Sequence, residues 1–66
     1  MTNLEYYKDK IKEYCKHDTL MPSVMTVMFE LGVDYNKYDE EHDSDILVLN
    51  WLVDNYNEGD KNAKNN

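Results

Sequence analysis

Apolar residues return at helical spacing over the first part of the chain. Those that share one face, about 100° wide, are Leu4, Tyr7, Ile11, Tyr14 and Cys15. The segment from Thr2 to Glu5 matches a capping box, in which the Thr2 hydroxyl accepts from the Glu5 amide and the Glu5 carboxylate accepts from the Thr2 amide. The pattern therefore predicts an amphipathic helix that begins at Thr2.

A second apolar segment lies between Pro22 and Gly32. Pro22 suits the first turn of a helix because its missing N–H would have no intrahelical partner there, and Gly32 is typical of a helix end. The residues on one stripe of this helix are Val24, Val27, Met28 and Leu31. Met25 and Phe29 widen the apolar surface to one side, so the predicted helix is either central to the fold or lies at an interface.

The third apolar segment follows Asp43 and Ser44, either of which can cap a helix that runs to about Tyr56. One stripe of this helix consists of Ile46, Leu49, Val53 and Tyr56, while Leu47 and Trp51 lie together on another side. The apolar run 46–49 also fits a buried strand, since periodicity does not separate the two for short runs. We favour the helix because the sequence offers no second strand for it to pair with.

These segments predict an all-α fold, namely a small three-helix domain over residues 1–57 with an acidic loop between the second and third helices. Residues 58–66 have almost nothing to bury, and we expect them to form a disordered tail. A chain of 66 residues forms one domain at most and buries only about 60% of its unfolded surface. Cys15 is its only cysteine, so we expect association through a hydrophobic face, rather than a disulfide, to supply extra stability.

Negative charge is concentrated in one segment. The net charge is -7, the chain has no arginine, and six of the twelve residues from Asp34 to Asp45 are carboxylates. Such a density repels itself and favours a cationic partner. Direct binding to nucleic acid or to an anionic membrane is disfavoured, and so is a helix-turn-helix led by Asp43 and Asp45.

The sequence also bears on where the protein acts. No apolar run approaches the roughly 18 residues needed to cross a bilayer, and the first residues lack a basic region followed by a hydrophobic one. We therefore expect the protein to reside in the cytoplasm.

No residue pattern indicates catalysis. A Gly-rich phosphate-binding loop, HExxH and GxSxG are all absent from the sequence, so we expect neither an enzyme nor a cofactor. Cys15, His17 and His42 supply at most part of a zinc site, and a buried thiol with two surface histidines is the favoured interpretation. The acidic segment does not match the ligand spacing of a calcium loop, although a weak divalent-cation site is a lesser alternative. We predict no metal site.

Closely spaced carboxylates on a rigid support can imitate nucleic-acid phosphates and occupy a basic groove. We therefore predict a non-catalytic protein that binds and inhibits a basic, nucleic-acid-handling protein. The predicted partner-binding residues are Asp34, Tyr35, Tyr38, Asp39, Glu40, Glu41, Asp43 and Asp45. Tyr35 and Tyr38 are expected to stack on arginines of the groove. The alternative is an acidic surface that only aids solubility.

A separate group of apolar residues offers another interpretation. Its members are Met25, Phe29, Leu47 and Trp51. They either close the core or form a hydrophobic interface, because Trp, Phe and Met are favoured interface anchors. In the second case the chain is a structural module, and a homodimer is the expected assembly.

Residues 3–11 (NLEYYKDKI) and 49–58 (LNWLVDNYNE) resemble the opening and closing segments of small proteins carried by phages and prophages of Gram-positive bacteria. Many such proteins carry a cysteine cluster between these segments, but this chain has only Cys15, so no metal site is implied for it. The resemblance implies a virus-encoded accessory protein in the host bacterial cytoplasm. Small acidic proteins of that origin often disarm host enzymes that act on nucleic acid, including CRISPR nucleases and restriction systems.

Overall fold

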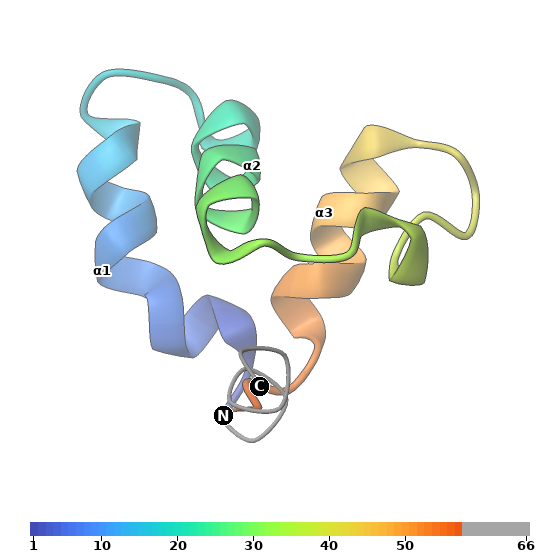
Figure 1. Cartoon of the computed structure of the whole chain (residues 1–66). Coiled ribbons are helices and arrows are strands. Elements are labelled where there is room, and N and C mark those ends of the chain that lie inside the picture. The colour runs from blue at the N-terminus through green and yellow to red at the C-terminus, as the bar shows by residue number, and fades with distance from the viewer. Residues whose placement is uncertain (58–66) are drawn as a thin grey trace.

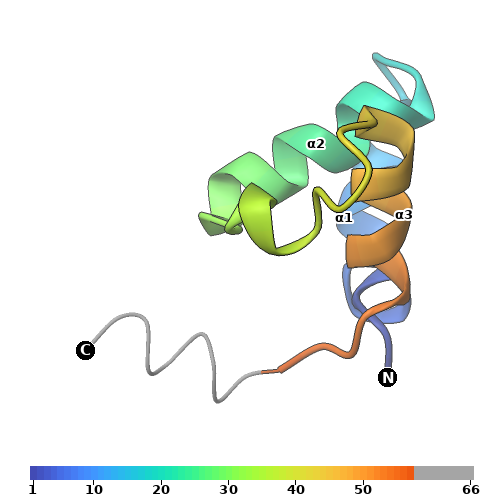
Figure 2. The same ribbon diagram turned by 90° about the vertical axis from the view of Figure 1, so that its right-hand side faces the viewer.

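The computed structural model describes residues 1–57, and the predicted tail 58–66 lies outside this range. Three α-helices follow one another, α1 (Asn3–Cys15), α2 (Leu20–Leu31) and α3 (Ser44–Val53), with a 3₁₀ turn η1 (Tyr35–Lys37) before α3. α1 and α3 converge where α1 begins and α3 ends, and α2 packs against both (Figure 1). Figure 2 shows α2 running across the other two helices. The all-α prediction is confirmed.

α1 begins where the capping box predicts. The Glu5 amide donates to Thr2 Oγ1 at 3.2 Å, and the Thr2 amide donates to Glu5 Oε1 at 2.8 Å. Two amides that a helix start leaves without partners are thereby satisfied. The helix start is therefore encoded by four consecutive residues.

α2 ends at Gly32, as predicted. Gly32 has φ 69° and ψ 35°, a left-handed conformation that a side chain disfavours. Its amide donates to the Phe29 carbonyl, and the Val33 amide donates to the Met28 carbonyl at 3.0 Å. This arrangement is a Schellman motif, which satisfies the last carbonyls of the helix and turns the chain toward η1.

α3 begins after Asp43 but ends at Val53, three residues short of the predicted Tyr56. Asp54 is extended (φ -73°, ψ 155°) because the chain here pairs with the N-terminus. The Asn3 amide donates to the Asp54 carbonyl at 2.8 Å, and the Tyr56 amide donates to the Met1 carbonyl at 2.9 Å. Contacts with a distant segment therefore replace the last turn of the predicted helix.

The core lies where the three helices meet. Its buried apolar residues are Ile11, Val24, Val27, Met28, Leu47, Val48 and Trp51. On α2 this confirms most of the predicted stripe. On α1 only Ile11 is fully buried; Tyr7 and Tyr14 are half-buried, and both Leu4 and Cys15 are exposed. The prediction of a buried thiol was wrong, because Cys15 is the last residue of α1, where the chain leaves the core for α2.

The sequence left open which face of α3 is buried, and the structure decides it. Leu47, Val48 and Trp51 face the core, whereas Leu49 and Val53, two members of the predicted stripe, are 53% and 60% exposed. Apolar residues lie on all sides of this short helix, so periodicity could not choose between its faces. Packing of Leu47, Val48 and Trp51 against α1 and α2 decides the choice, and the buried Asn3 side chain, which donates from Nδ2 to the Trp51 carbonyl at 2.8 Å, adds a tertiary hydrogen bond to this arrangement.

This orientation corrects the proposed hydrophobic interface. Leu47 (6% exposed) and Trp51 (3% exposed) belong to the core, and Met25 packs against it, so these three cannot form a free surface. Phe29 alone of the four is largely exposed, at 78%. The four residues therefore do not act as one set.

Candidate functional site

The six carboxylates of residues 34–45 lie between α2 and α3, and three of them have local structural roles. Asp34 accepts from the Asn36 amide at 3.1 Å and caps η1. Asp43 accepts from the Asp45 amide at 2.8 Å and caps α3. Asp39 is half-buried and lies 3.4 Å from His42 Nδ1. Three of the six carboxylates, Asp34, Asp39 and Asp43, therefore contact polar groups of the chain itself.

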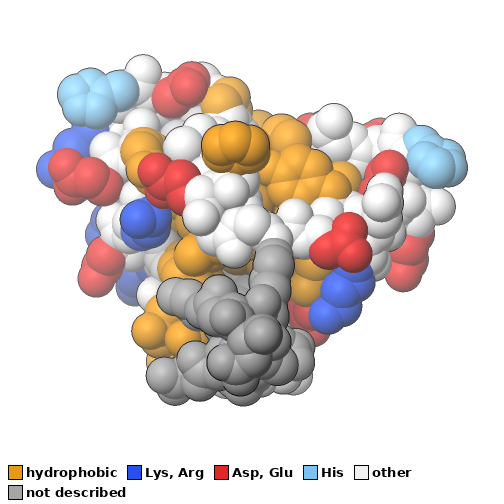
Figure 3. All heavy atoms as spheres, viewed as in Figure 1, with side chains coloured by type: hydrophobic (Ala, Val, Ile, Leu, Met, Phe, Trp, Pro, Cys, Tyr) orange, Lys and Arg blue, Asp and Glu red, His pale blue; other side chains and the backbone are white. Residues whose placement is uncertain are grey.

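The other three carboxylates, Glu40, Glu41 and Asp45, are exposed. Within residues 1–57 their side chains make no hydrogen bond or ion pair. In Figure 3, acidic side chains project from this end of the molecule beside a basic group and a histidine, and the α1 side also carries acidic and basic groups intermixed. These three carboxylates are thus the ones that remain available to a cationic partner.

Two tyrosines attach the acidic segment to the helices. The Tyr35 hydroxyl donates to the Met25 carbonyl at 3.3 Å, and the Tyr38 hydroxyl donates to Asp54 Oδ2 at 2.7 Å. Asn50 Nδ2 adds a hydrogen bond to the Tyr38 carbonyl at 3.1 Å. Both rings are half-buried and pack against the core. Tyr35 therefore supports the segment rather than presenting a free ring.

The Tyr38 hydrogen bond is the main reason why the pKa of Asp54 lies below its ordinary value; the Asn55 amide and the Lys37 ammonium act in the same direction against partial desolvation. The pKa of Glu30 is lowered in the same way by the Tyr14 hydroxyl, which donates to it across α1 and α2 at 2.6 Å. Both carboxylates therefore favour the folded state when they are ionised.

We expect these hydrogen bonds to make stability depend on acidity. A carboxyl group with a lowered folded-state pKa contributes stability that is fully present above its unfolded pKa, about 4, and is lost as the pH falls through the folded value. The melting temperature should therefore decrease as the pH is lowered below about 4. The decrease should be less steep in Tyr38→Phe, which lacks the hydroxyl donor to Asp54. Thermal denaturation across this pH range measures the difference, and parallel curves for the two proteins would contradict it.

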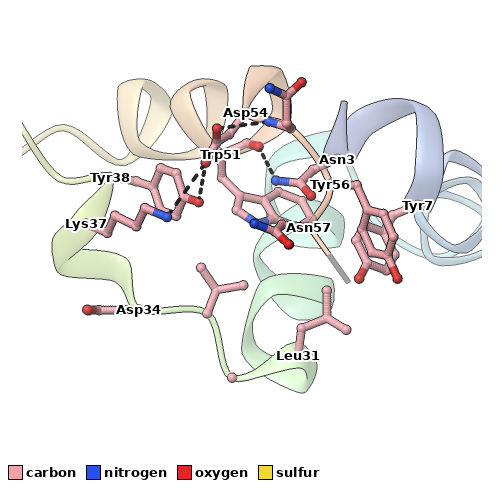
Figure 4. Close-up of a pocket in the computed structure, with 13 residues that line it drawn as sticks. Asn3, Tyr7, Leu31, Asp34, Lys37, Tyr38, Trp51, Asp54, Tyr56 and Asn57 are labelled. Carbon is pink, nitrogen blue, oxygen red and sulfur yellow. Dashed lines mark hydrogen bonds and ion pairs between the residues drawn. The ribbon is translucent and has the colours of Figure 1, made fainter. Parts of the chain in front are cut away.

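A cavity of about 330 Å³ lies beside the acidic segment. Figure 4 shows Tyr38 and Lys37 on one side, Tyr7 and Tyr56 on the other, and the Trp51 indole between them. These residues come from α1, the end of η1, α3 and the segment after α3, so no local sequence pattern indicates the cavity.

Cys15, His17 and His42, weighed in the sequence as part of a zinc site, are not brought together by the structure. His17 follows α1 and His42 precedes α3, and these two segments lie at opposite ends of the molecule in Figure 1. Across residues 1–57, no group of three or more His, Cys, Asp or Glu side chains is placed to hold a metal ion. Cys15, His17 and His42 therefore do not form a common site.

Comparison with known proteins returns no match to a protein family, to a curated protein or to a solved structure. None of the helices in the described part of the chain is both long enough and apolar enough to span a membrane. The function must therefore be argued from the site itself.

Sequence reasoning found the acidic segment but missed Asn3 and Asp54. Asn3 is a polar residue that is only 6% exposed. Its side chain donates a hydrogen bond to the Trp51 carbonyl. Asp54 accepts from Tyr38 and lies 4.0 Å from Lys37. The position of Asn3 just after the N-cap explains its presence in a helix start but gives no sign that its side chain reaches α3.

Proposed function

We propose that this chain is a non-catalytic inhibitor that binds a basic, nucleic-acid-handling protein through its acidic segment. The observation that carries the proposal is the state of Glu40, Glu41 and Asp45, which are exposed and without partners within residues 1–57. Their segment is attached at Tyr35 and Tyr38. These carboxylates are available to cations, and the attached segment already limits the backbone freedom that is lost when they bind.

The physical basis is mimicry of nucleic-acid charge. A groove that binds phosphates carries clustered lysines and arginines, and an array of carboxylates can neutralise the same cations. Long-range attraction between a chain of net charge -7 and such a groove also speeds association. Pre-organisation of the segment reduces the entropy lost on binding. The bound inhibitor then excludes the nucleic acid.

The proposed origin of the chain follows from its two phage-like segments, residues 3–11 and 49–58. A phage accessory protein would act in the cytoplasm of a Gram-positive host, and its target would be a host enzyme that acts on nucleic acid. CRISPR nucleases and restriction enzymes are the target class that this origin favours.

An affinity capture tests the proposal. The immobilised chain is exposed to lysate of a Gram-positive bacterium at low salt, and bound proteins are eluted with a salt gradient and identified by mass spectrometry. We expect a basic nucleic-acid-binding protein to elute at moderate salt, because screening weakens contacts between exposed charges. The nuclease or DNA-binding activity of that protein should then fall when the chain is added. Binding that is insensitive to salt would overturn the proposal.

Self-association is a second candidate, favoured by the exposed face of α3. Leu49 and Val53 are one helical turn apart and more than half exposed, and Phe29 is the most exposed large apolar side chain of residues 1–57. A homodimer would cover such residues. Light scattering measures the mass directly: a dimer that Leu49→Lys converts to a monomer would support this candidate, and a monomeric wild-type chain would exclude it.

A further inference from the structure

The cavity beside the acidic segment has the size and the walls of a binding site. Its volume of about 330 Å³ lies at the small end of the range for ligand sites, enough for one large side chain. Aromatic rings form much of the wall, with Tyr38 opposite Tyr7 and Tyr56 and with the Trp51 indole between them (Figure 4). Such walls suit a flat or elongated group.

One cation of the chain already lies at this cavity. Lys37 Nζ is 5.4 Å from the centroid of the Tyr38 ring and 4.0 Å from Asp54 Oδ2. The ring face and the carboxylate therefore jointly attract a positive charge. The ion pair is long, and the lysine side chain is 58% exposed, so solvent screens the contact and holds it weakly. A better-fitting cation can displace this ammonium.

The side-chain amide of Asn3 also lies at the cavity wall. Asn3 Nδ2 donates to the Trp51 carbonyl, which fixes the orientation of the amide and leaves Oδ1 as its other polar atom. Oδ1 accepts no hydrogen bond within residues 1–57. No fully enclosed side-chain oxygen or nitrogen of these residues lacks a partner, so Oδ1 is at least partly accessible, and Asn3 is one of the residues that line the cavity. An amide oxygen in this position can accept a hydrogen bond from a ligand.

We propose that this cavity receives an arginine side chain of the basic partner protein. The guanidinium lies against the Tyr38 ring, donates to Asp54 and to Asn3 Oδ1, and replaces the Lys37 ammonium. Arginine fits because its planar group stacks on aromatic rings and has five N–H donors and no acceptor. This inference rests on the proposed function, which supplies a basic partner, and it names the side chain that the partner inserts.

Asp54 is suited to this role at neutral pH. The hydrogen bond from Tyr38 lowers the pKa of Asp54, so its carboxylate stays ionised. A hydrogen bond between a carboxylate and a guanidinium is stronger than one between neutral groups. The site therefore discriminates by charge as well as by shape.

Peptide binding tests the site without knowledge of the partner. The probe is a capped Gly-Arg-Gly tripeptide, and the signal is the fluorescence of Trp51, the only tryptophan of the chain. We expect saturable binding of this peptide. A matched peptide with citrulline in place of arginine keeps the shape but loses the charge, and should bind about tenfold more weakly or worse. Equal binding of the two peptides would overturn the proposal.

Two substitutions in the full chain locate the binding. Asp54→Asn keeps an acceptor for Tyr38 and should weaken arginine-peptide binding about tenfold or more, whereas Glu40→Gln removes the same charge outside the cavity and should change it less than twofold. Lys37→Gln removes the resident cation and should strengthen binding roughly threefold or more. Because Lys37 is exposed, Lys37→Gln should fold normally, so it tests the proposal even if Asp54→Asn unfolds. Weaker or unchanged peptide binding in Lys37→Gln overturns the proposal.

The same variants separate this inference from the proposed function. If the partner captured from lysate is retained by Asp54→Asn but lost when Glu40, Glu41 and Asp45 are neutralised, the cavity proposal fails and the proposed function stands. If the arginine peptide binds as expected and no basic protein is captured, the cavity proposal stands and the proposed function fails.

Discussion

Trp51→Ala is expected to destabilise the domain by about 3–5 kcal/mol. Trp51 is only 3% exposed, stacks near Tyr7 with ring centroids 5.7 Å apart, and lies in the core beside Val48. Its removal leaves a large void between α1 and α3. A domain of about 60 residues has a total stability on the order of 3–9 kcal/mol, so most of the variant chains should be unfolded.

Phe29→Ala is the matched control for this prediction. Both residues are large aromatics of the predicted interface, but Phe29 is 78% exposed and should change the free energy of unfolding by no more than about 0.5 kcal/mol. Urea denaturation followed by far-UV circular dichroism measures both variants. A larger loss in Phe29→Ala than in Trp51→Ala would show that these two residues are assigned to the wrong sides of the core boundary.

The second large effect is expected on partner binding, from the combined change Glu40→Gln, Glu41→Gln and Asp45→Asn. Exposed ion pairs contribute about 0.2–1 kcal/mol each, so the three together should weaken binding by roughly 3- to 150-fold at low salt. The salt dependence of binding should fall in the same variant. Asp34 and Asp43 are left unchanged because they cap η1 and α3.

A control with the same net charge separates a local site from a general charge effect. Asp9→Asn, Glu13→Gln and Asp18→Asn remove three carboxylates from α1 and the residues that follow it. This variant should retain most of the binding, because its charges lie on the side of the molecule away from the acidic segment. If the two triple variants lose binding equally, only the total charge matters and the proposed site is wrong.

The starts and ends of the helices were largely predictable because they depend on neighbouring residues. The Thr2–Glu5 capping box, the left-handed Gly32 and the Asp43 cap each act within a few positions of the chain. Hydrogen bonds of this range form in any fold that contains the helix. The end of α3 was predicted wrongly, since residues 54–56 pair with residues 1–3 instead of adding a turn, and α2 begins at Leu20, slightly before the predicted Pro22.

The candidate site was predictable only in part. The concentration of carboxylates between residues 34 and 45 is visible in the sequence, and so is the preference for a cationic partner. Sequence alone did not separate Asp34 and Asp43, which cap helical turns, from Glu40, which has no partner within residues 1–57. Nor did it show that Tyr35 and Tyr38 are held by hydrogen bonds to Met25 and Asp54.

The sequence by itself determined three helices, most of their boundaries and the place of the negative charge, because caps, periodicity and charge are properties of short segments. Only the tertiary structure decided that α3 turns Trp51 inward and Leu49 outward. Apolar residues surround α3, so its orientation depends on packing against α1 and α2 and on long-range contacts such as the hydrogen bond from Asn3, 48 positions away from Trp51. The same long-range pairing of the two ends of the domain creates the cavity, which no local pattern could have indicated.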